Sequence, residues 1–101
     1  MKKARLPSGS NYQLSRIGDG AGDSGPLLHP VDRVNGKQLT DRNGWIEVGL
    51  SVLCGSLIAR SYTAQDYWLT SAVTEILDVS DDGRVVRFAT GNSVYVAQCL
   101  K

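Results

Sequence analysis

The stretch Tyr67–Leu100, YWLTSAVTEILDVSDDGRVVRFATGNSVYVAQCL, decides the fold that the sequence predicts. It contains three runs rich in β-branched and aromatic residues, which are the residue types favoured in strands. These runs are Val73–Val79, Arg84–Thr90 and Ser93–Leu100. Because they follow one another at hairpin distance, the sequence predicts three consecutive antiparallel strands.

The two connections between these runs have the composition of tight turns. In the first, Asp81 and Asp82 can hydrogen-bond their own backbone, and Gly83 can adopt a positive φ. In the second, Gly91 and Asn92 both tolerate the positive φ that primed hairpin turns require. We therefore predict a hairpin closed by a primed turn at Gly91-Asn92.

The residues before this meander differ in composition between an early and a later part. Residues 1–44 are interrupted by glycine and proline, which excludes helical periodicity and leaves short extended pieces at 12–17, 27–29 and 31–34. Gly18–Gly25 is expected to be a mobile loop of small residues. From Trp45 the chain is apolar and β-branched, which predicts strands at 45–48 and 50–59.

Glycines within the second part indicate how these strands bend. Gly49 and Gly55 interrupt an otherwise strand-like run, and a glycine inside a strand often marks a bulge or a sharp bend. A helix over Gly49–Ala59 is the alternative, although Gly55 and two β-branched residues disfavour it.

The order of these elements resembles that of an SH3-like small barrel: a curved strand, a loop with aromatic residues at its rim, and a three-stranded meander. The resemblance implies an all-β fold forming one domain over residues 1–101, with an irregular, loop-rich N-terminal segment at 1–44 and a barrel core at 45–101. The acidic and aromatic signature of SH3 domains that bind proline-rich peptides is absent, so that ligand class is not implied.

Two short phrases also resemble the ends of small uncharacterised proteins carried on phages, plasmids and gene cassettes. They are WLTSAVTEI at 68–76 and TGNSVY at 90–95. The resemblance implies a mobile-element origin and no particular activity.

Charge and hydropathy exclude several classes of protein. A net charge of +1 gives no overall argument for binding nucleic acid or a membrane surface. The basic start at Met1–Arg5 lacks the following apolar run of roughly 7 to 15 residues that a signal peptide needs. No run approaches the roughly 20 apolar residues of a membrane helix. We expect a cytoplasmic protein.

The sequence does not predict a metal or cofactor site. Cys54, Cys99 and His29 are too few and too widely spaced to form a metal site. The two cysteines lie in apolar runs, so buried free thiols are the expectation and a Cys54–Cys99 disulfide is the alternative.

One motif suggests a hydrolase, but the rest of the chain lacks the residues and the size that such an enzyme needs. Asp23-Ser24-Gly25-Pro26-Leu27 resembles the nucleophile segment GDSGGPL of chymotrypsin-like proteases, with one glycine missing. The resemblance requires a histidine and an aspartate held by a much larger double barrel, whereas the only histidine here is His29. Nor does Gly18–Asp23 have the following helix of a phosphate loop or the terminal glutamate of a calcium loop. We expect no enzyme.

Aromatic residues near one arginine form the candidate binding site. They are Trp45, Tyr62, Tyr67 and Trp68, with Arg60 nearby. Such residues are enriched at interface hot spots and can also stack nucleobases. The alternative for each tryptophan is a packing role in the core. The remaining basic residues, among them Lys2, Lys3, Arg5, Arg84 and Arg87, are scattered and are expected to be solvated surface.

The sequence therefore favours a non-enzymatic protein-interaction module whose partner is another protein or a second copy of itself. A mobile-element accessory or inhibitor protein is one form that such a module takes. Single-stranded nucleic-acid binding by stacking on Tyr62, Tyr67 and Trp68 is an alternative, although the basic charge for phosphate contacts is missing. A barrel that binds a small molecule is a third hypothesis.

Overall fold

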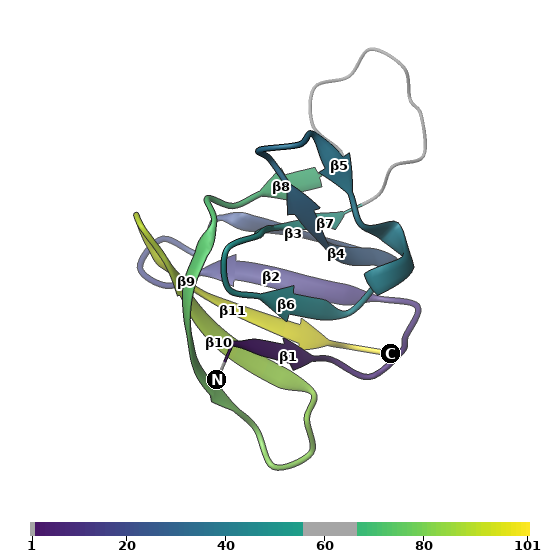
Figure 1. Cartoon of the computed structure of the whole chain (residues 1–101). Helices are drawn as coiled ribbons and strands as arrows, with labels where there is room; N and C mark the ends of the chain where they lie inside the picture. Colours follow the sequence, from purple (N-terminus) through teal and green to yellow (C-terminus); the bar gives the residue numbers. More distant parts are fainter. Residues whose placement is uncertain (1, 56–66) are drawn as a thin grey trace.

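The computed structural model describes residues 2–55 and 67–101 and has an all-β architecture, as predicted (Figure 1). Its larger sheet has the strand order β3-β2-β11-β10-β9. These strands are β2 (Tyr12–Arg16), β3 (Gly22–Gly25), β9 (Val73–Val79), β10 (Val85–Thr90) and β11 (Val94–Cys99).

A second sheet and a two-stranded ribbon complete the described strands. The second sheet has the order β5-β4-β7-β8 and consists of β4 (Leu27–Asp32), β5 (Lys37–Gln38), β7 (Ser51–Gly55) and β8 (Tyr67–Leu69). The ribbon pairs β1 (Lys3–Arg5) with β6 (Trp45–Glu47). A single 3₁₀ turn, η1 (Thr40–Arg42), precedes β6, and no helix of the described residues could cross a membrane.

The predicted meander is confirmed in β9, β10 and β11, and so is the positive φ of Gly83, at 71°. The primed turn is wrong, because Gly91 does not have a positive φ. Instead, the Thr90 hydroxyl accepts the backbone N–H groups of Asn92 and Ser93 at 3.3 and 3.2 Å. Hydrogen bonds to the Thr90 side chain, rather than a glycine with a positive φ, thus stabilise the turn of this hairpin.

Strand β9 is one of the two outer strands of the larger sheet and is interrupted twice. Its pairing with β10 shifts between Asp78 and Ile76 and again between Glu75 and Val73. Each shift leaves one residue of β9, Leu77 or Thr74, opposite no partner. Such bulges bend a strand and break the regular row of backbone groups at its edge.

The prediction of a loop over Gly18–Gly25 is wrong for its second half, because Gly22–Gly25 forms β3 beside β2. Close approach of other backbone explains these glycines. A Cβ atom on Gly22 would lie 1.9 Å from the Leu14 carbonyl oxygen, and one on Gly25 would lie 2.5 Å from that of Gly55. The glycines therefore allow strands to pack closely, which local composition does not distinguish from loop chemistry.

The core contains residues from both parts of the chain, although the sequence assigned the barrel core to residues 45–101. Leu6, Tyr12, Leu14 and Leu28 are fully or almost fully buried in one cluster with residues of the meander, including Phe88. The Tyr12 hydroxyl donates to the Pro7 carbonyl and accepts the Gly9 N–H, both at 3.1 Å. The first 44 residues thus contribute strands and packing rather than an appended loop.

The predicted strand at 50–59 is present as β7 over Ser51–Gly55, and residues 56–59 lie outside the described part. Both predicted bends have a positive φ, 94° at Gly49 and 149° at Gly55. Cys54 and Cys99 are buried and unpaired, as expected. Burial raises the pKa of the Cys54 thiol to about 12, so the sulfur stays protonated at neutral pH.

Candidate functional site

The β1–β6 ribbon has one apolar face and one polar face. Its register places Lys3 opposite Glu47, Ala4 opposite Ile46, and Arg5 opposite Trp45. Successive side chains of a strand point to opposite faces, so the buried pair Ala4 and Ile46 faces the core. The other two pairs share the outer face of the ribbon.

On this outer face, Trp45 is half-buried and lies close to two cations. The Lys3 Nζ atom is 5.3 Å, and the Arg5 Cζ atom 5.5 Å, from the centroid of the indole ring. At these distances a cation is attracted to the negative face of the ring. The ribbon thereby holds one large aromatic surface beside two basic side chains.

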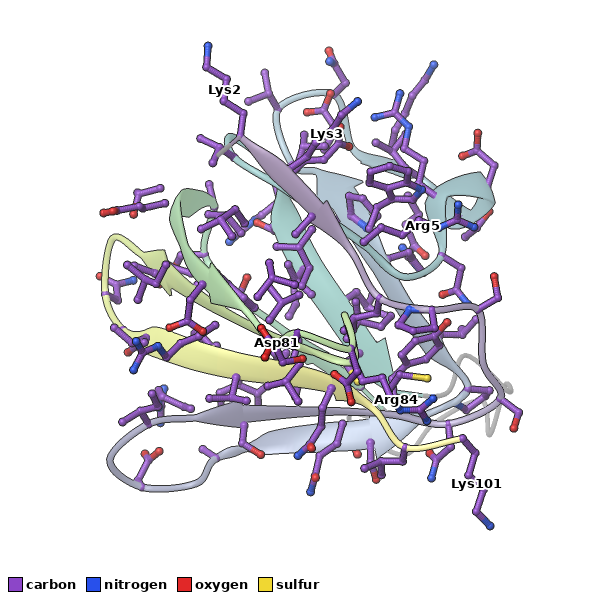
Figure 2. All side chains as sticks on the ribbon, turned by 90° about the horizontal axis from the view of Figure 1, so that it is seen from below. Lys2, Lys3, Arg5, Asp81, Arg84 and Lys101 are labelled. Carbon is purple, nitrogen blue, oxygen red and sulfur yellow. The ribbon has the colours of Figure 1, made fainter. Side chains whose placement is uncertain are left out.

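The 3₁₀ turn η1 adds Arg42 to the same surface. The Arg42 Nη1 atom donates to a carboxylate oxygen of Glu47 at 2.7 Å, and this pair borders a hollow of about 270 Å³ together with Lys3 and Trp45. Lys2, Lys3 and Arg5 lie along the edge of β1 in the view from below (Figure 2). We call the outer-face residues Lys3, Arg5, Arg42, Trp45 and Glu47 the ribbon surface.

The sequence identified only one residue of the ribbon surface, Trp45. It assigned Lys3 and Arg5 to scattered solvated surface. Both are exposed, as expected, but the register also brings both close to the indole ring. The sequence did contain a local signal for two short strands. In Lys3-Ala4-Arg5 and in Trp45-Ile46-Glu47, the central residue is apolar and its neighbours are polar or amphipathic.

The other predicted aromatic residues lie elsewhere. Tyr67 and Trp68 are on β8 in the second sheet, where Tyr67 is 40% exposed and Trp68 packs against the core cluster. Trp45 is not next to them in the sheet order. Arg60 and Tyr62 lie outside the described residues, so their predicted role stays a prediction.

Trp68 has a different set of contacts from Trp45. Its indole N–H donates to the Tyr95 hydroxyl at 3.2 Å, and the Arg16 guanidinium lies 5.3 Å from the indole centroid. Arg16 also forms two hydrogen bonds to the Asp19 carboxylate, at 3.0 and 2.5 Å. This contact lowers the pKa of Asp19 to about 2, so the carboxylate is charged at neutral pH.

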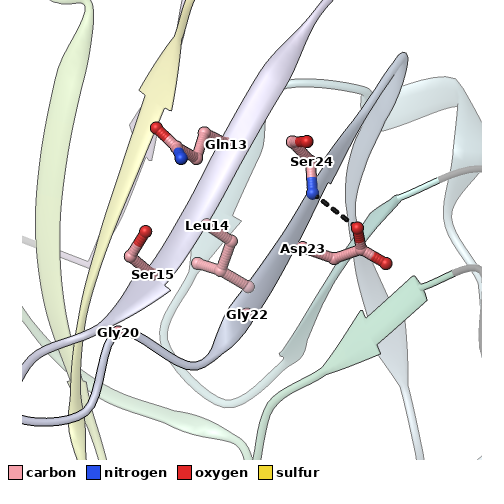
Figure 3. Close-up of a pocket in the computed structure, with 7 residues that line it drawn as sticks. All are labelled: Gln13, Leu14, Ser15, Gly20, Gly22, Asp23 and Ser24. Carbon is pink, nitrogen blue, oxygen red and sulfur yellow. Dashed lines mark hydrogen bonds between the residues drawn. The ribbon is translucent and has the colours of Figure 1, made fainter.

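The residues of the protease-like motif do not form a triad. Ser24 is exposed on the outer face of the β2–β3 hairpin with Gln13 and Ser15 (Figure 3). The Asp23 carboxylate accepts the backbone N–H of Ser24 at 2.7 Å rather than orienting an imidazole. His29 is fully buried on β4, and its Nδ1 atom lies 3.1 Å from the Pro30 carbonyl oxygen. No hydrogen bond joins His29 to Ser24 in the described structure.

Two buried polar atoms have no hydrogen-bond partner within the described residues: His29 Nε2 and Ser51 Oγ. They lie on the paired strands β4 and β7, where His29 is opposite Leu53 and Ser51 opposite Val31. In residues 2–55 and 67–101, no three side chains of His, Cys, Asp or Glu gather where they could hold a metal ion.

Comparisons with known proteins add no relative to this description. No protein-family model, curated protein or solved structure matches the chain. The resemblances to SH3-like barrels and to proteins of mobile elements therefore stay predictions.

Proposed function

We propose that this protein is a non-enzymatic interaction module that binds another protein through the ribbon surface. The observation that carries the proposal is the position of Trp45, half-buried on the outer face of the ribbon with Lys3 and Arg5 beside its ring. Tryptophan and arginine are the residues most enriched at interface hot spots, where an anchored ring fits a partner's surface.

The positioning of Trp45 favours recognition over packing. Its ring is attached to a ribbon whose opposite face is anchored in the core by Ala4 and Ile46. A partner can therefore contact the ring without disturbing the fold, and the rigid ribbon lowers the entropy lost on binding. The adjoining hollow of about 270 Å³ has room for one side chain of a partner.

Nucleic acid and small molecules have less support as ligands. A base would have to displace Lys3 or Arg5 to stack fully on Trp45. Trp68 is one of the residues predicted to stack on nucleobases, but its indole N–H already donates to Tyr95 and its ring packs against the core. We retain an SH3-like barrel, a mobile-element origin and a cytoplasmic location as parts of the proposal.

An affinity pull-down from the native host tests the proposal, with Trp45→Ala as the disabling variant. Val34→Ala is the matched control, because Val34 is an apolar residue 95% exposed in the β4–β5 connection, away from the ribbon. We expect the wild type and the control to capture a protein that Trp45→Ala loses. Identical capture by all three proteins would contradict the proposal, and light scattering would show whether the partner is a second copy.

A further inference from the structure

The backbone of β1 has an unused side. Hydrogen bonds from Val48 N to Lys2 O and from Leu6 N to Gly44 O fix which residues of β1 point their backbone groups toward β6. In an antiparallel pair these residues alternate, so Lys2, Ala4 and Leu6 face β6. The N–H and C=O groups of Lys3 and Arg5 therefore point away from it.

No other described strand pairs with this side of β1. The sheet order ends at β1, and the structure shows no hydrogen bond to the N–H and C=O groups of Lys3 or Arg5 among the described residues. Both residues are exposed. An open strand edge of this kind can accept an additional strand from another chain.

We propose that an extended acidic segment of the partner protein adds to the free edge of β1 as a third strand of the ribbon. This inference rests on the proposed function and specifies how the partner engages the ribbon surface. Backbone hydrogen bonds to Lys3 and Arg5 hold the added strand. Its acidic side chains contact the two basic side chains on the outer face.

Charge complementarity identifies the partner segment as acidic. Lys3 and Arg5 place two cations on the outer face of this edge, and the acidic Glu47 is already paired with Arg42. Because neighbouring residues on adjacent strands share a face, every second residue of the added strand lies beside Lys3 or Arg5. The intervening residues lie on the face of Ala4 and are expected to be apolar.

A comparison with β9 supports β1 as the strand to which a partner strand adds. Bulges at Leu77 and Thr74 interrupt the regularity of β9, and the Val73 end already bonds to residues 49 and 50. No register shift interrupts the pairing of β1 with β6. Of these two outer strands, β1 has the regular geometry that an incoming strand requires.

Amide hydrogen exchange of the full chain, followed by NMR, tests the inference. The probe is a short synthetic peptide of alternating glutamate and valine. We expect it to slow exchange of the Lys3 and Arg5 amides at least about tenfold, while the Ala4 amide, already bonded to β6, changes little. Methylating the peptide nitrogens that face β1 should abolish this protection, whereas methylating the alternate nitrogens should preserve it.

Two control ligands test the chemistry. A peptide with glutamine in place of glutamate should bind at least about tenfold more weakly, because the ionic contacts are lost. Equal affinity for both peptides would overturn the acidic specificity. Tighter binding of a single-stranded oligonucleotide than of the acidic peptide would overturn a protein segment as the occupant.

The outcomes separate this inference from the proposed function. Acidic-peptide binding that depends on Trp45 but leaves the Lys3 and Arg5 amides unprotected would overturn strand addition and leave the ribbon surface as a binding site. Capture of a host partner that survives Trp45→Ala would instead contradict the proposed function. Lys3→Ala and Arg5→Ala are expected to weaken peptide binding without changing the fold, since both side chains are exposed.

Discussion

Trp45 and Trp68 are both half-buried, and each has a cation near its ring, but their surroundings differ. Trp68 packs against the core cluster and donates its indole N–H to Tyr95 in the opposite sheet. Trp45 lies on the outer face of a ribbon whose other face is the buried one. Burial and residue type therefore do not separate a tryptophan that packs in the core from one that we propose to bind a partner. The contacts of each ring do.

The largest expected effect on stability comes from removing Trp68. Trp68→Ala deletes an aromatic side chain packed against the core and leaves a cavity, so we expect the free energy of unfolding to fall by about 2–4 kcal/mol. Urea denaturation followed by circular dichroism measures the change. A loss below about 0.5 kcal/mol, the usual range for surface substitutions, would assign Trp68 to the surface and erase the contrast with Trp45.

A smaller loss is expected from Tyr95→Phe. This substitution keeps the ring that stacks on Phe88 at a centroid distance of 5.6 Å and removes only the hydroxyl that accepts the Trp68 N–H. Leaving that donor without its partner should lower the free energy of unfolding by about 1–2 kcal/mol. In a double-mutant cycle with Trp68→Phe, additive losses would show that this hydrogen bond does not couple the two residues.

Trp45→Ala should have a modest effect on stability and a large effect on binding. The lost contacts include two cation–π interactions, each worth about 0.5–1 kcal/mol, so we expect the free energy of unfolding to fall by about 1–2 kcal/mol. Affinity for the partner should fall at least about tenfold, as for a hot-spot residue. Titration calorimetry and urea denaturation on the same preparation separate the two effects. A stability loss as large as that of Trp68→Ala would show that Trp45 mainly packs in the fold rather than serving to bind a partner.

The smallest expected effect concerns Asp19, which holds Arg16 beside Trp68. Its pKa is lowered from the usual 3.8 to about 2, so the contact with Arg16 stabilises the fold above about pH 4 and is lost as the pH falls through 2. Asp19→Asn should lower the melting temperature slightly at pH 7, because the pair is exposed. The difference from the wild type should shrink toward zero near pH 2. A difference that grew on acidification would contradict the assignment.

The sequence predicted those parts of the fold whose signals are local. The strand Val73–Val79 matches β9 at both ends, since β-branched residues and the turn at Gly83 lie within the same short stretch. Strand β3 was not predicted, because Gly22 and Gly25 are needed for contacts with Leu14 and Gly55. From composition alone, a segment with so many glycines is predicted to be a loop.

The candidate site was predictable only in part for the same reason. Trp45 was identified from its residue type, but its neighbours Lys3 and Arg5 lie about forty residues earlier in the chain. A three-residue strand has too short a pattern to specify its partner, and no local rule pairs Lys3-Ala4-Arg5 with Trp45-Ile46-Glu47. The pairing depends on the burial of Ala4 and Ile46 in a shared core.

The two bulges of β9 have a consequence for the behaviour of the protein at high concentration. A long regular strand at the margin of a sheet offers a template on which identical chains can stack, and the unpaired residues Leu77 and Thr74 break that template twice. Deleting both Leu77 and Thr74 would restore a regular repeat along β9, and we expect such a chain to form fibrils that bind thioflavin T. The bulges of this strand would then be what prevents the protein from aggregating at high concentration.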